Sequence, residues 1–430
     1  MEERHLDRSS EWLKRALAVI PSATQTFSKG RRAYVEGVGP AFVARARGSH
    51  VWDVDGHEYI DYPMGLGAVT LGHAYPAVNE AVTRQLAEGV SFSVAHPLEV
   101  ALAETLTEIL PGADMVRFGK NGSDATSGAV RAARALTGRD VIACCGYHGW
   151  QDWYIATTTR AAGIPKAVRE LTVPFAYNDL ASLERVFADH RGRVAAVIME
   201  PVGVVPPAPG FLQAVRDLAH REGALLIFDE IVTGFRLALG GAQEMFGVIP
   251  DLSCFGKGMG NGFPIAAVVG RRDLMEVFDQ LFFSFTFGGE AASLAAALAT
   301  VREMCDKPVI PHLWRQGERL RDGFNALARA AGLGRHAECV GYPPRTVITF
   351  ADPAGGDPAV LKTLFLQEAI KRGILLGGGM NVSFSHDDDD VTRTLAAYEA
   401  ALAEVAAAVK AGDAARRLQG RVVEPVFRKP

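Results

Sequence analysis

Short apolar runs alternate with helical patterns between residues 113 and 305, and this alternation is the strongest structural signal in the chain. Strands are predicted where the runs are uninterrupted, at 115–118, 141–144, 194–199, 224–228, 252–255 and 265–269. Helices are predicted near 123–137, 211–222 and 290–305. Apolar strands without polar alternation are typical of a sheet that is covered on both faces. The pattern therefore predicts an α/β fold.

The flanking regions follow a different pattern. Apolar runs on either side of Asp55-Gly56 predict a β-meander over residues 41–62, because Asp-Gly favours a tight turn between two strands. Residues 312–410 combine strand and helix patterns, which predicts an α+β region. The clearest flanking elements are helices at 76–88, 98–110 and 391–410 and a strand at 346–350. A charged, amphipathic helix is also predicted at the amino terminus.

Composition places the chain among ordinary globular proteins. It has 430 residues, of which 48% are hydrophobic and 22% charged, and its net charge of −4 does not favour a partner such as nucleic acid. No apolar run reaches the ~18 residues that predict a membrane span, and the amino terminus lacks the apolar core of a signal peptide. Five scattered cysteines without a CxxC pair are typical of a reducing compartment. We therefore expect a cytoplasmic protein that does not span a membrane.

Polar residues that directly follow three of the predicted strands are the candidates for chemistry. They are Asp229-Glu230, Lys257, and the segment from Lys120 to Asp124. In a sheet of this kind, ligands bind beyond the carboxyl ends of the strands. We therefore expect these three groups to lie at one edge of the sheet.

Nucleotide-binding and metal-binding interpretations fit this pattern less well. Asp229-Glu230 after an apolar run resembles a Walker B strand, but the GxxxxGK[ST] loop that should accompany it is absent. The alternating glycines of the segment 256–262 do not form a GxGxxG fingerprint with its acidic partner. HExxH is absent as well. Cys144-Cys145 fit strand packing and Asp387–Asp390 fit a helix amino terminus, so no metal site is expected.

The same three groups fit the chemistry of pyridoxal phosphate (PLP). Lys257, flanked by glycines, can form an imine with the cofactor, and Asp229 can keep the ring nitrogen protonated. Asn121–Ser123 open a helix, so their amides and the serine hydroxyl can bind a phosphate. Tyr147, after the strand at 141–144, can stack on the cofactor ring. Each residue alone more often has a structural role, and spacing by itself leaves both interpretations open.

Taken together, these segments resemble the class III aminotransferases of fold type I, and within that family they are most similar to the glutamate-1-semialdehyde aminomutase group. The similarity runs almost from end to end. It is carried by Val51–Tyr62, Leu71-Gly72-His73, Asn121–Thr126, Tyr147-His148-Gly149, Glu200-Pro201, Phe228–Arg236 and Gly256-Lys257. The most specific part is Asp-Glu-x-x-Thr-Gly-Phe-Arg from Asp229 onward, followed by Gly256-Lys257.

The resemblance implies PLP as cofactor and assigns residues to it. Lys257 is expected to form the Schiff base and to shuttle protons, and Asp229 to hold the ring nitrogen. The implied cofactor-binding set is Asn121, Gly122, Ser123, Tyr147, His148, Asp229, Val232, Lys257 and Thr286. Thr286 matches a threonine that reaches the phosphate of the neighbouring subunit, which implies a homodimer with shared active sites.

The resemblance also implies the domain organisation. A large PLP-binding domain with a mostly parallel, seven-stranded sheet is expected at 76–308. A small α+β domain is expected from both termini, 1–75 and 309–430.

Departures from the family pattern fall on substrate positions. The implied substrate residues are Glu200, Lys29 and Leu66. Lys29 stands where the aminomutase has a carboxylate-binding arginine, and lysine binds a carboxylate only as a point charge. Leu66 stands where the aminomutase has an aromatic residue. Residues 158–166 replace the glycine- and serine-rich gating loop of the aminomutase.

These departures leave the cofactor set intact. They favour an intermolecular aminotransferase acting on a small-molecule amino donor, such as glutamate, and a carbonyl acceptor. The aminomutase activity stays open as the alternative. A non-catalytic PLP-binding protein is a more remote alternative. The acceptor itself stays open among sugar carbonyls, keto acids and aldehydes.

Overall fold

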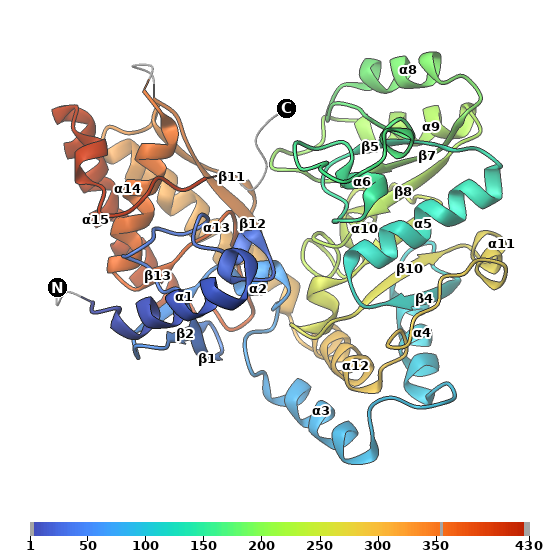
Figure 1. Ribbon diagram of the computed structural model, residues 1–430, viewed down its shortest axis with the longest axis horizontal. Coiled ribbons are helices and arrows are strands. Elements are labelled where there is room, and N and C mark those ends of the chain that lie inside the picture. Colours follow the sequence, from blue (N-terminus) through green and yellow to red (C-terminus); the bar gives the residue numbers. More distant parts are fainter. Residues whose placement is uncertain (1–3, 353–355, 425–430) are drawn as a thin grey trace. The chain divides into compact units, whose positions relative to one another are not determined.

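The computed structural model describes residues 4–352 and 356–424 of the chain (Figure 1). The chain forms two compact units. The large unit runs from Pro76 to Ile310. The small unit comprises the described residues up to Tyr75 and those from Pro311 onward.

A seven-stranded sheet organises the large unit, with strand order β4-β10-β9-β8-β7-β5-β6. Its strands are β4 (Met115–Gly119), β5 (Val141–Cys145), β6 (Thr172–Pro174), β7 (Val194–Met199), β8 (Leu225–Asp229), β9 (Leu252–Phe255) and β10 (Ala266–Gly270). Strands β6, β5, β7, β8 and β9 pair in parallel, and β10 runs antiparallel to both of its neighbours. The mostly parallel, seven-stranded sheet implied by the resemblance is therefore confirmed. The short edge strand β6 was not predicted.

Helices cover both faces of this sheet. Along β5, Ile142 and Cys144 pack in one apolar cluster with residues of α5 (Gly122–Thr137). The intervening Val141, Ala143 and Cys145 pack in a second cluster with α8 (Leu180–Asp189) and α9 (Phe211–Arg221). Burial on both faces explains why these strands lack polar alternation. Cys144 and Cys145 are both buried in β5, so the prediction that they pack within a strand is confirmed. Burial raises the pKa of both thiols to about 12.

Figure 1 also draws the remaining helices of the large unit, of which α3 packs against α12. They are α3 (Pro76–Glu88), α4 (Pro97–Ile109), α6 (Asp152–Ile155), α7 (Lys166–Arg169), α10 (Gly241–Phe246), α11 (Arg272–Met275) and α12 (Ala291–Asp306). The predicted helices at 76–88, 98–110 and 290–305 are confirmed by α3, α4 and α12. Within the described residues, no helix is long and apolar enough to cross a membrane.

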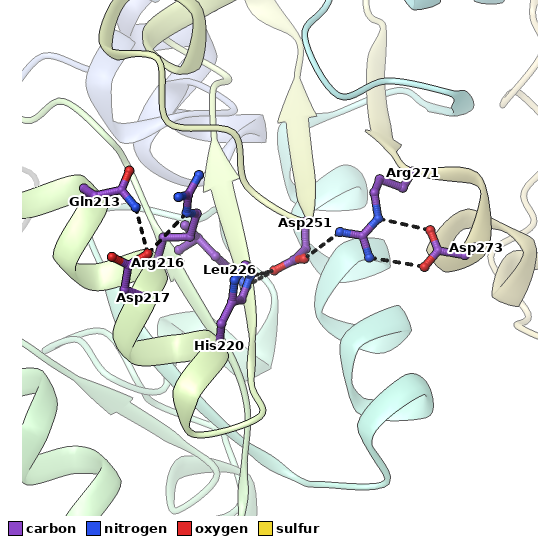
Figure 2. A network of polar contacts seen from close by, with 8 residues as sticks. All are labelled: Gln213, Arg216, Asp217, His220, Leu226, Asp251, Arg271 and Asp273. Carbon is purple, nitrogen blue, oxygen red and sulfur yellow. Dashed lines mark hydrogen bonds and ion pairs between the residues drawn. The ribbon is translucent and has the colours of Figure 1, made fainter.

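A polar network fixes the amino-terminal ends of β8 and β9 (Figure 2). Asp251 directly precedes β9 and is 4% exposed. Its Oδ2 accepts the amide of Leu226 on β8 at 2.8 Å and lies 2.8 Å from His220 Nε2 at the end of α9. Arg271 contacts Asp251 Oδ1 at 3.4 Å and pairs with Asp273 at 3.1 Å. These contacts hold the two strands whose opposite ends carry the candidate chemistry.

The small unit is α+β, as predicted. Strands β1 (Val43–Arg47), β2 (His50–Asp53) and β3 (Glu58–Asp61) form the antiparallel meander, and β13 (Ile374–Leu375) pairs in parallel with β3. A second sheet contains β11 (Ala337–Tyr342), β12 (Arg345–Phe350) and β14 (Met380–Asn381). The helices are α1 (Asp7–Val19), α2 (Met64–Gly67), α13 (Val309–Ala330), α14 (Pro358–Lys371) and α15 (Asp388–Ala411). The predicted amino-terminal, middle-strand and final-helix elements are confirmed by α1, β12 and α15.

The acidic run at 387–390 serves the start of α15. Asp387 Oδ1 accepts the amide of Asp390 at 2.9 Å, which satisfies one of the free donors at a helix amino terminus. Asp390 is buried and accepts a hydrogen bond from the Ser49 hydroxyl at 2.6 Å. The helix-terminal role predicted for this run is therefore confirmed.

Candidate active site

The carboxyl ends of the parallel strands bring the predicted residues of the large unit to one edge of the sheet. Asp229 is the last residue of β8, and Lys257 follows the neighbouring strand β9. His148 follows β5, and Glu200 follows β7 directly. Asn121–Ser123 follow β4, which runs in the same direction because both β4 and β9 are antiparallel to β10. The sequence-based expectation of one shared edge is confirmed for these groups.

Asp229 is a buried carboxylate with two fixed partners. It is 4% exposed, and its Oδ1 accepts the amide of Ile231 at 3.1 Å. Its Oδ2 lies 2.8 Å from Nδ1 of His148, whose side chain is fully buried. The carboxylate accepts a hydrogen bond from Nδ1–H when the imidazole carries its proton there. Nε2 of His148 has no partner within the described residues. This pairing fixes the orientation of the carboxylate at the end of β8.

His148 is itself held by residues that the sequence reasoning missed. The Thr126 hydroxyl donates to the His148 carbonyl at 2.9 Å. The Trp153 ring stacks on the imidazole at 6.1 Å between centroids, and the Tyr154 ring meets it edge-on at 5.2 Å. The cluster of aromatic residues shortly after 147 was the available signal for this support. The imidazole therefore has little freedom to turn away from Asp229.

The amino terminus of α5 forms a cradle for an anion. Among the described residues, no acceptor contacts the amides of Gly122 and Ser123, the first two residues of this 16-residue helix. The preceding amides of Lys120 and Asn121 are bound by the Asp124 carboxylate at 3.0 and 2.8 Å. Free amides at a helix start, together with the helix dipole, bind phosphate groups. The cradle thus fits the phosphate of PLP.

Gly149 keeps this cradle open beside Ser123. A Cβ atom at position 149 would lie 2.2 Å from the Ser123 hydroxyl oxygen, and the glycine has a left-handed φ of 105°. Ser123 is 8% exposed, and its hydroxyl accepts the Trp150 amide at 3.3 Å. Glycine is therefore required here by both space and backbone conformation.

An ion pair that the sequence reasoning missed lies next to the cradle. Lys120 Nζ contacts Glu290 Oε2 at 2.9 Å, with side chains only 13% and 15% exposed. Glu290 caps α12 through the amides of Ala292 and Ser293 at 2.8 and 3.2 Å. Burial raises the pKa of Glu290, but the hydrogen bonds from Ser293 and Lys120 outweigh it and hold the pKa below its usual value. The pair links the cradle to the segment just before α12.

Lys257 adopts a backbone conformation that few lysines have. Its φ is 40°, in the left-handed region, at the start of the short 3₁₀ helix Lys257–Gly260. A non-glycine residue in this region is strained by roughly 1–3 kcal/mol, a cost that is typical of functional sites. The side chain is half-buried beyond β9. Val232, also half-buried, lies in the turn after β8.

Glu200 fixes the backbone next to Tyr147. Its Oε2 accepts the Tyr147 amide at 2.9 Å, and a Cβ atom at Gly146 would lie 2.6 Å from that oxygen. The Tyr147 side chain is 46% exposed, so its ring has an open face. Partial burial and the nearby carboxylates of Asp229 and Glu200 raise the pKa of the Tyr147 hydroxyl, so it stays protonated.

Glu230 has a structural environment that differs from that of Asp229. It is fully buried and accepts the amides of Ala242 and Gln243 at 2.8 and 2.7 Å, together with the Thr233 hydroxyl. Burial raises its pKa to about 7. The carboxyl group thus anchors the start of α10.

Three further predicted residues belong to other segments of the chain. Thr286 is in the exposed segment Ser284–Phe287 of the large unit. Lys29 and Leu66 belong to the small unit: Lys29 is exposed in the 3₁₀ turn Phe27–Lys29, and Leu66 has a left-handed φ of 62° in α2.

Comparison with known proteins places this arrangement in a family. The profile of the class III aminotransferases matches residues 33–335. The chain is 36% identical to the glutamate-1-semialdehyde 2,1-aminomutase of Desulforamulus reducens, over 91% of this chain and 96% of that protein. It is 35% identical to the 3-aminobutyryl-CoA aminotransferase of Cloacimonas acidaminovorans, over 94% and 99%.

A solved structure agrees with these relatives. The PLP internal aldimine form of the FumI protein of Sphingopyxis sp. MTA144 superposes with a TM-score of 0.88 and 31% identity, over 97% of this chain and 99% of that one. The fold type I architecture expected from the sequence is thereby confirmed. The chain belongs to the class III aminotransferase family.

Proposed function

We propose that the protein is a PLP-dependent aminotransferase that moves an amino group from a donor such as glutamate to a carbonyl acceptor, with Lys257 as the lysine that holds the cofactor. The buried Asp229–His148 pair at the end of β8 carries this proposal, because it lies one strand from Lys257 and has the chemistry of a ring-nitrogen partner. The free amides at the start of α5 support it as the phosphate site.

The residues of this chain have separate tasks in such a reaction. When bound, PLP supplies an electron sink that stabilises the negative charge left when the substrate Cα loses a proton. Asp229 would hold the protonated ring nitrogen, and His148 orients the Asp229 carboxylate. The amides of Gly122 and Ser123 bind the phosphate. Lys257 removes the proton from Cα and returns it to the carbon that accepts it.

Two further residues of the large unit would hold the cofactor ring, Tyr147 and Val232. Tyr147 has an exposed ring that can cover one face of the cofactor, and Glu200 fixes its backbone. We propose that Val232 contacts the other side of the ring. Lys29 and Leu66 of the small unit are proposed to contact substrate, and the two units are proposed to correspond to the large and small domains expected from the sequence.

The active protein is proposed to be a homodimer in which Thr286 completes the partner's phosphate site. Several apolar side chains of the large unit support this: Phe282 is 83% exposed, Val94 80%, Trp150 69% and Phe287 58%. Contiguous apolar patches on a protein surface mark interaction sites. Two of them flank Thr286 within five residues along the chain.

We propose residence in the cytoplasm. All five cysteines are free, and four of them are buried. Free, buried thiols are typical of proteins that fold in a reducing compartment.

Chemical trapping of the cofactor tests the proposed role of Lys257. Borohydride reduction of the holoprotein fixes PLP to the amine that holds it, and peptide mass mapping then locates the modified residue. The expected result is modification of Lys257, with no comparable labelling of the half-buried Lys120 or Lys362. Labelling of another lysine in place of Lys257 contradicts the proposal.

A further inference from the structure

An asparagine-glycine pair at the start of α5 has a reactivity that the proposed function does not use. Asn121 is exposed at the amino-terminal cap of this helix, and Gly122 is the first helical residue. The side-chain amide of an asparagine is open to attack by the backbone nitrogen of the next residue. Glycine at that next position favours the attack, because it has no Cβ to obstruct the approach. The pair therefore has the chemistry of a spontaneous deamidation site.

The nitrogen that would attack is available in this structure. No acceptor among the described residues binds the amide of Gly122. The helix dipole places partial positive charge at this end of α5, which favours loss of the amide proton and so makes the nitrogen a better nucleophile. On the side chain, Nδ2 of Asn121 contacts Asp124 Oδ2 at 3.5 Å, a long distance for a hydrogen bond.

Backbone geometry opposes the attack while the first turn of α5 is closed. Asn121 has an extended ψ of 156°, and its carbonyl accepts the amides of Asp124 and Ala125 at 3.0 and 3.3 Å. Rotation about ψ, which brings the Gly122 nitrogen to the side chain, breaks these bonds. Helix ends open at low cost in free energy, so the rotation is accessible without global unfolding. A phosphate on the amides of Gly122 and Ser123 would hold the turn closed and occupy the nitrogen.

A second asparagine-glycine pair allows a comparison within the same chain. Asn261 precedes Gly262 and directly follows the 3₁₀ helix Lys257–Gly260. It is only 8% exposed and has a left-handed φ of 45°. Burial restricts both the backbone rotation and the entry of water. The two pairs thus share their local sequence and differ in exposure and in backbone conformation.

We propose that Asn121 is a deamidation site that is open in the apoprotein and closed by the phosphate of the cofactor. The Gly122 nitrogen forms a bond with Cγ of Asn121, and its proton leaves with the side-chain NH2 as ammonia. The resulting cyclic imide is opened by water at one of its two carbonyls, which gives aspartate or isoaspartate. One water is consumed and one ammonia is released, and no oxidant or reductant is required. Protection by the cofactor rests on the proposed function.

The product places a new carboxylate beside the phosphate cradle. Asn121 adjoins the amides of Gly122 and Ser123, and a carboxylate there repels a phosphate dianion. Isoaspartate also lengthens the backbone by one methylene group, which displaces the start of α5. Deamidated apoprotein should therefore lose affinity for PLP, whereas the holoprotein should keep its cofactor site.

Ageing in a mildly alkaline, phosphate-free buffer, followed by peptide mass mapping, tests the site. Apoprotein, holoprotein and apoprotein with added pyridoxal are incubated in parallel. Pyridoxal lacks the phosphate and leaves the cradle free. We expect conversion of Asn121 in the apoprotein and in the pyridoxal sample, and conversion slower by roughly 10-fold or more in the holoprotein. Asn261 should stay unchanged in all three samples.

Two variants link the modification to the cofactor site. Asn121→Ser lacks the reacting amide, so its apoprotein should have the same affinity for PLP before and after ageing. Asn121→Asp is one of the two products and should bind PLP roughly 10-fold more weakly than the wild type. Wild-type affinity in Asn121→Asp and in the aged apoprotein would contradict the predicted consequence.

Three results of the mass mapping would overturn the proposal itself. They are an unmodified Asn121 in the aged apoprotein, equal rates at Asn121 with and without bound PLP, and a rate at Asn121 no higher than that at Asn261. Failure of the proposed function is a separate result, because borohydride reduction would then leave no PLP on Lys257. In that case inorganic phosphate replaces PLP as the protecting anion in the same comparison.

Discussion

At the scale of single residues, the hydrogen bond between His148 and Asp229 joins two positions that are 81 residues apart in the sequence. Each was assigned to the cofactor by resemblance, but their pairing depends on the sheet order, in which β7 lies between β5 and β8. Hydrophobic patterns predict strands and not the order in which they pair. The sequence therefore predicted the two residues and missed the contact that orients them, as well as the Trp153 and Tyr154 rings around it.

His148 acts through Asp229. Replacing His148 should therefore slow the chemical step more than it weakens substrate binding. In His148→Ala we expect kcat to fall by roughly 10-fold, equivalent to about 1.4 kcal/mol in the activation free energy, while KM for the amino donor stays nearly constant. The absorbance of the bound cofactor should titrate at lower pH in the variant, because an unsupported Asp229 holds the ring proton less tightly.

Steady-state kinetics and a pH titration of the cofactor absorbance check this prediction. His148→Gln retains a side-chain donor and should recover part of the rate. A drop in thermal stability with unchanged kcat and an unchanged titration would instead assign His148 a structural role.

At the scale of elements, the sequence patterns were most informative where the residues of a segment determine its structure without distant partners. The apolar runs predicted the buried strands, and Asp387–Asp390 predicted the start of α15, because these signals are local. The three-residue strand β6 is too short to produce a pattern. The Lys120–Glu290 pair joins residues 170 positions apart, a separation at which no sequence period applies.

This ion pair should couple the phosphate cradle to the start of α12. We expect Lys120→Met and Glu290→Gln each to weaken PLP binding to the apoprotein, and the double variant to be no weaker than the worse single one. Residues in direct contact show coupling energies of about 0.5–3 kcal/mol, and the low exposure of this pair limits screening by solvent.

Titration of the apoprotein with PLP, followed by fluorescence, measures all four dissociation constants. The exposed pair Lys166–Glu170, 90% and 63% exposed, is the matched control, and Lys166→Met should bind PLP like the wild type. Strictly additive effects of the two variants would show that the pair does not act as a unit.

At the scale of the whole molecule, the resemblance was more informative than the patterns. The periodicity of apolar residues predicted a central α/β region between a β-meander and an α+β region. It did not show that segments from both ends of the chain form one unit. In that unit, β13 pairs with β3 although more than 300 residues separate them. The family resemblance implied this organisation, and the proposed homodimer extends it to Thr286.

The central claim concerns the reaction, and its most direct test is the absorbance spectrum of the holoprotein before and after addition of L-glutamate alone. We predict that the long-wavelength band of the lysine-bound cofactor is replaced by the band of its amino form, and that Lys257→Ala shows no such conversion. Two results together would contradict this claim: glutamate leaves the band unchanged, and the protein converts glutamate-1-semialdehyde without any other amino donor or acceptor. They would identify the protein as an aminomutase.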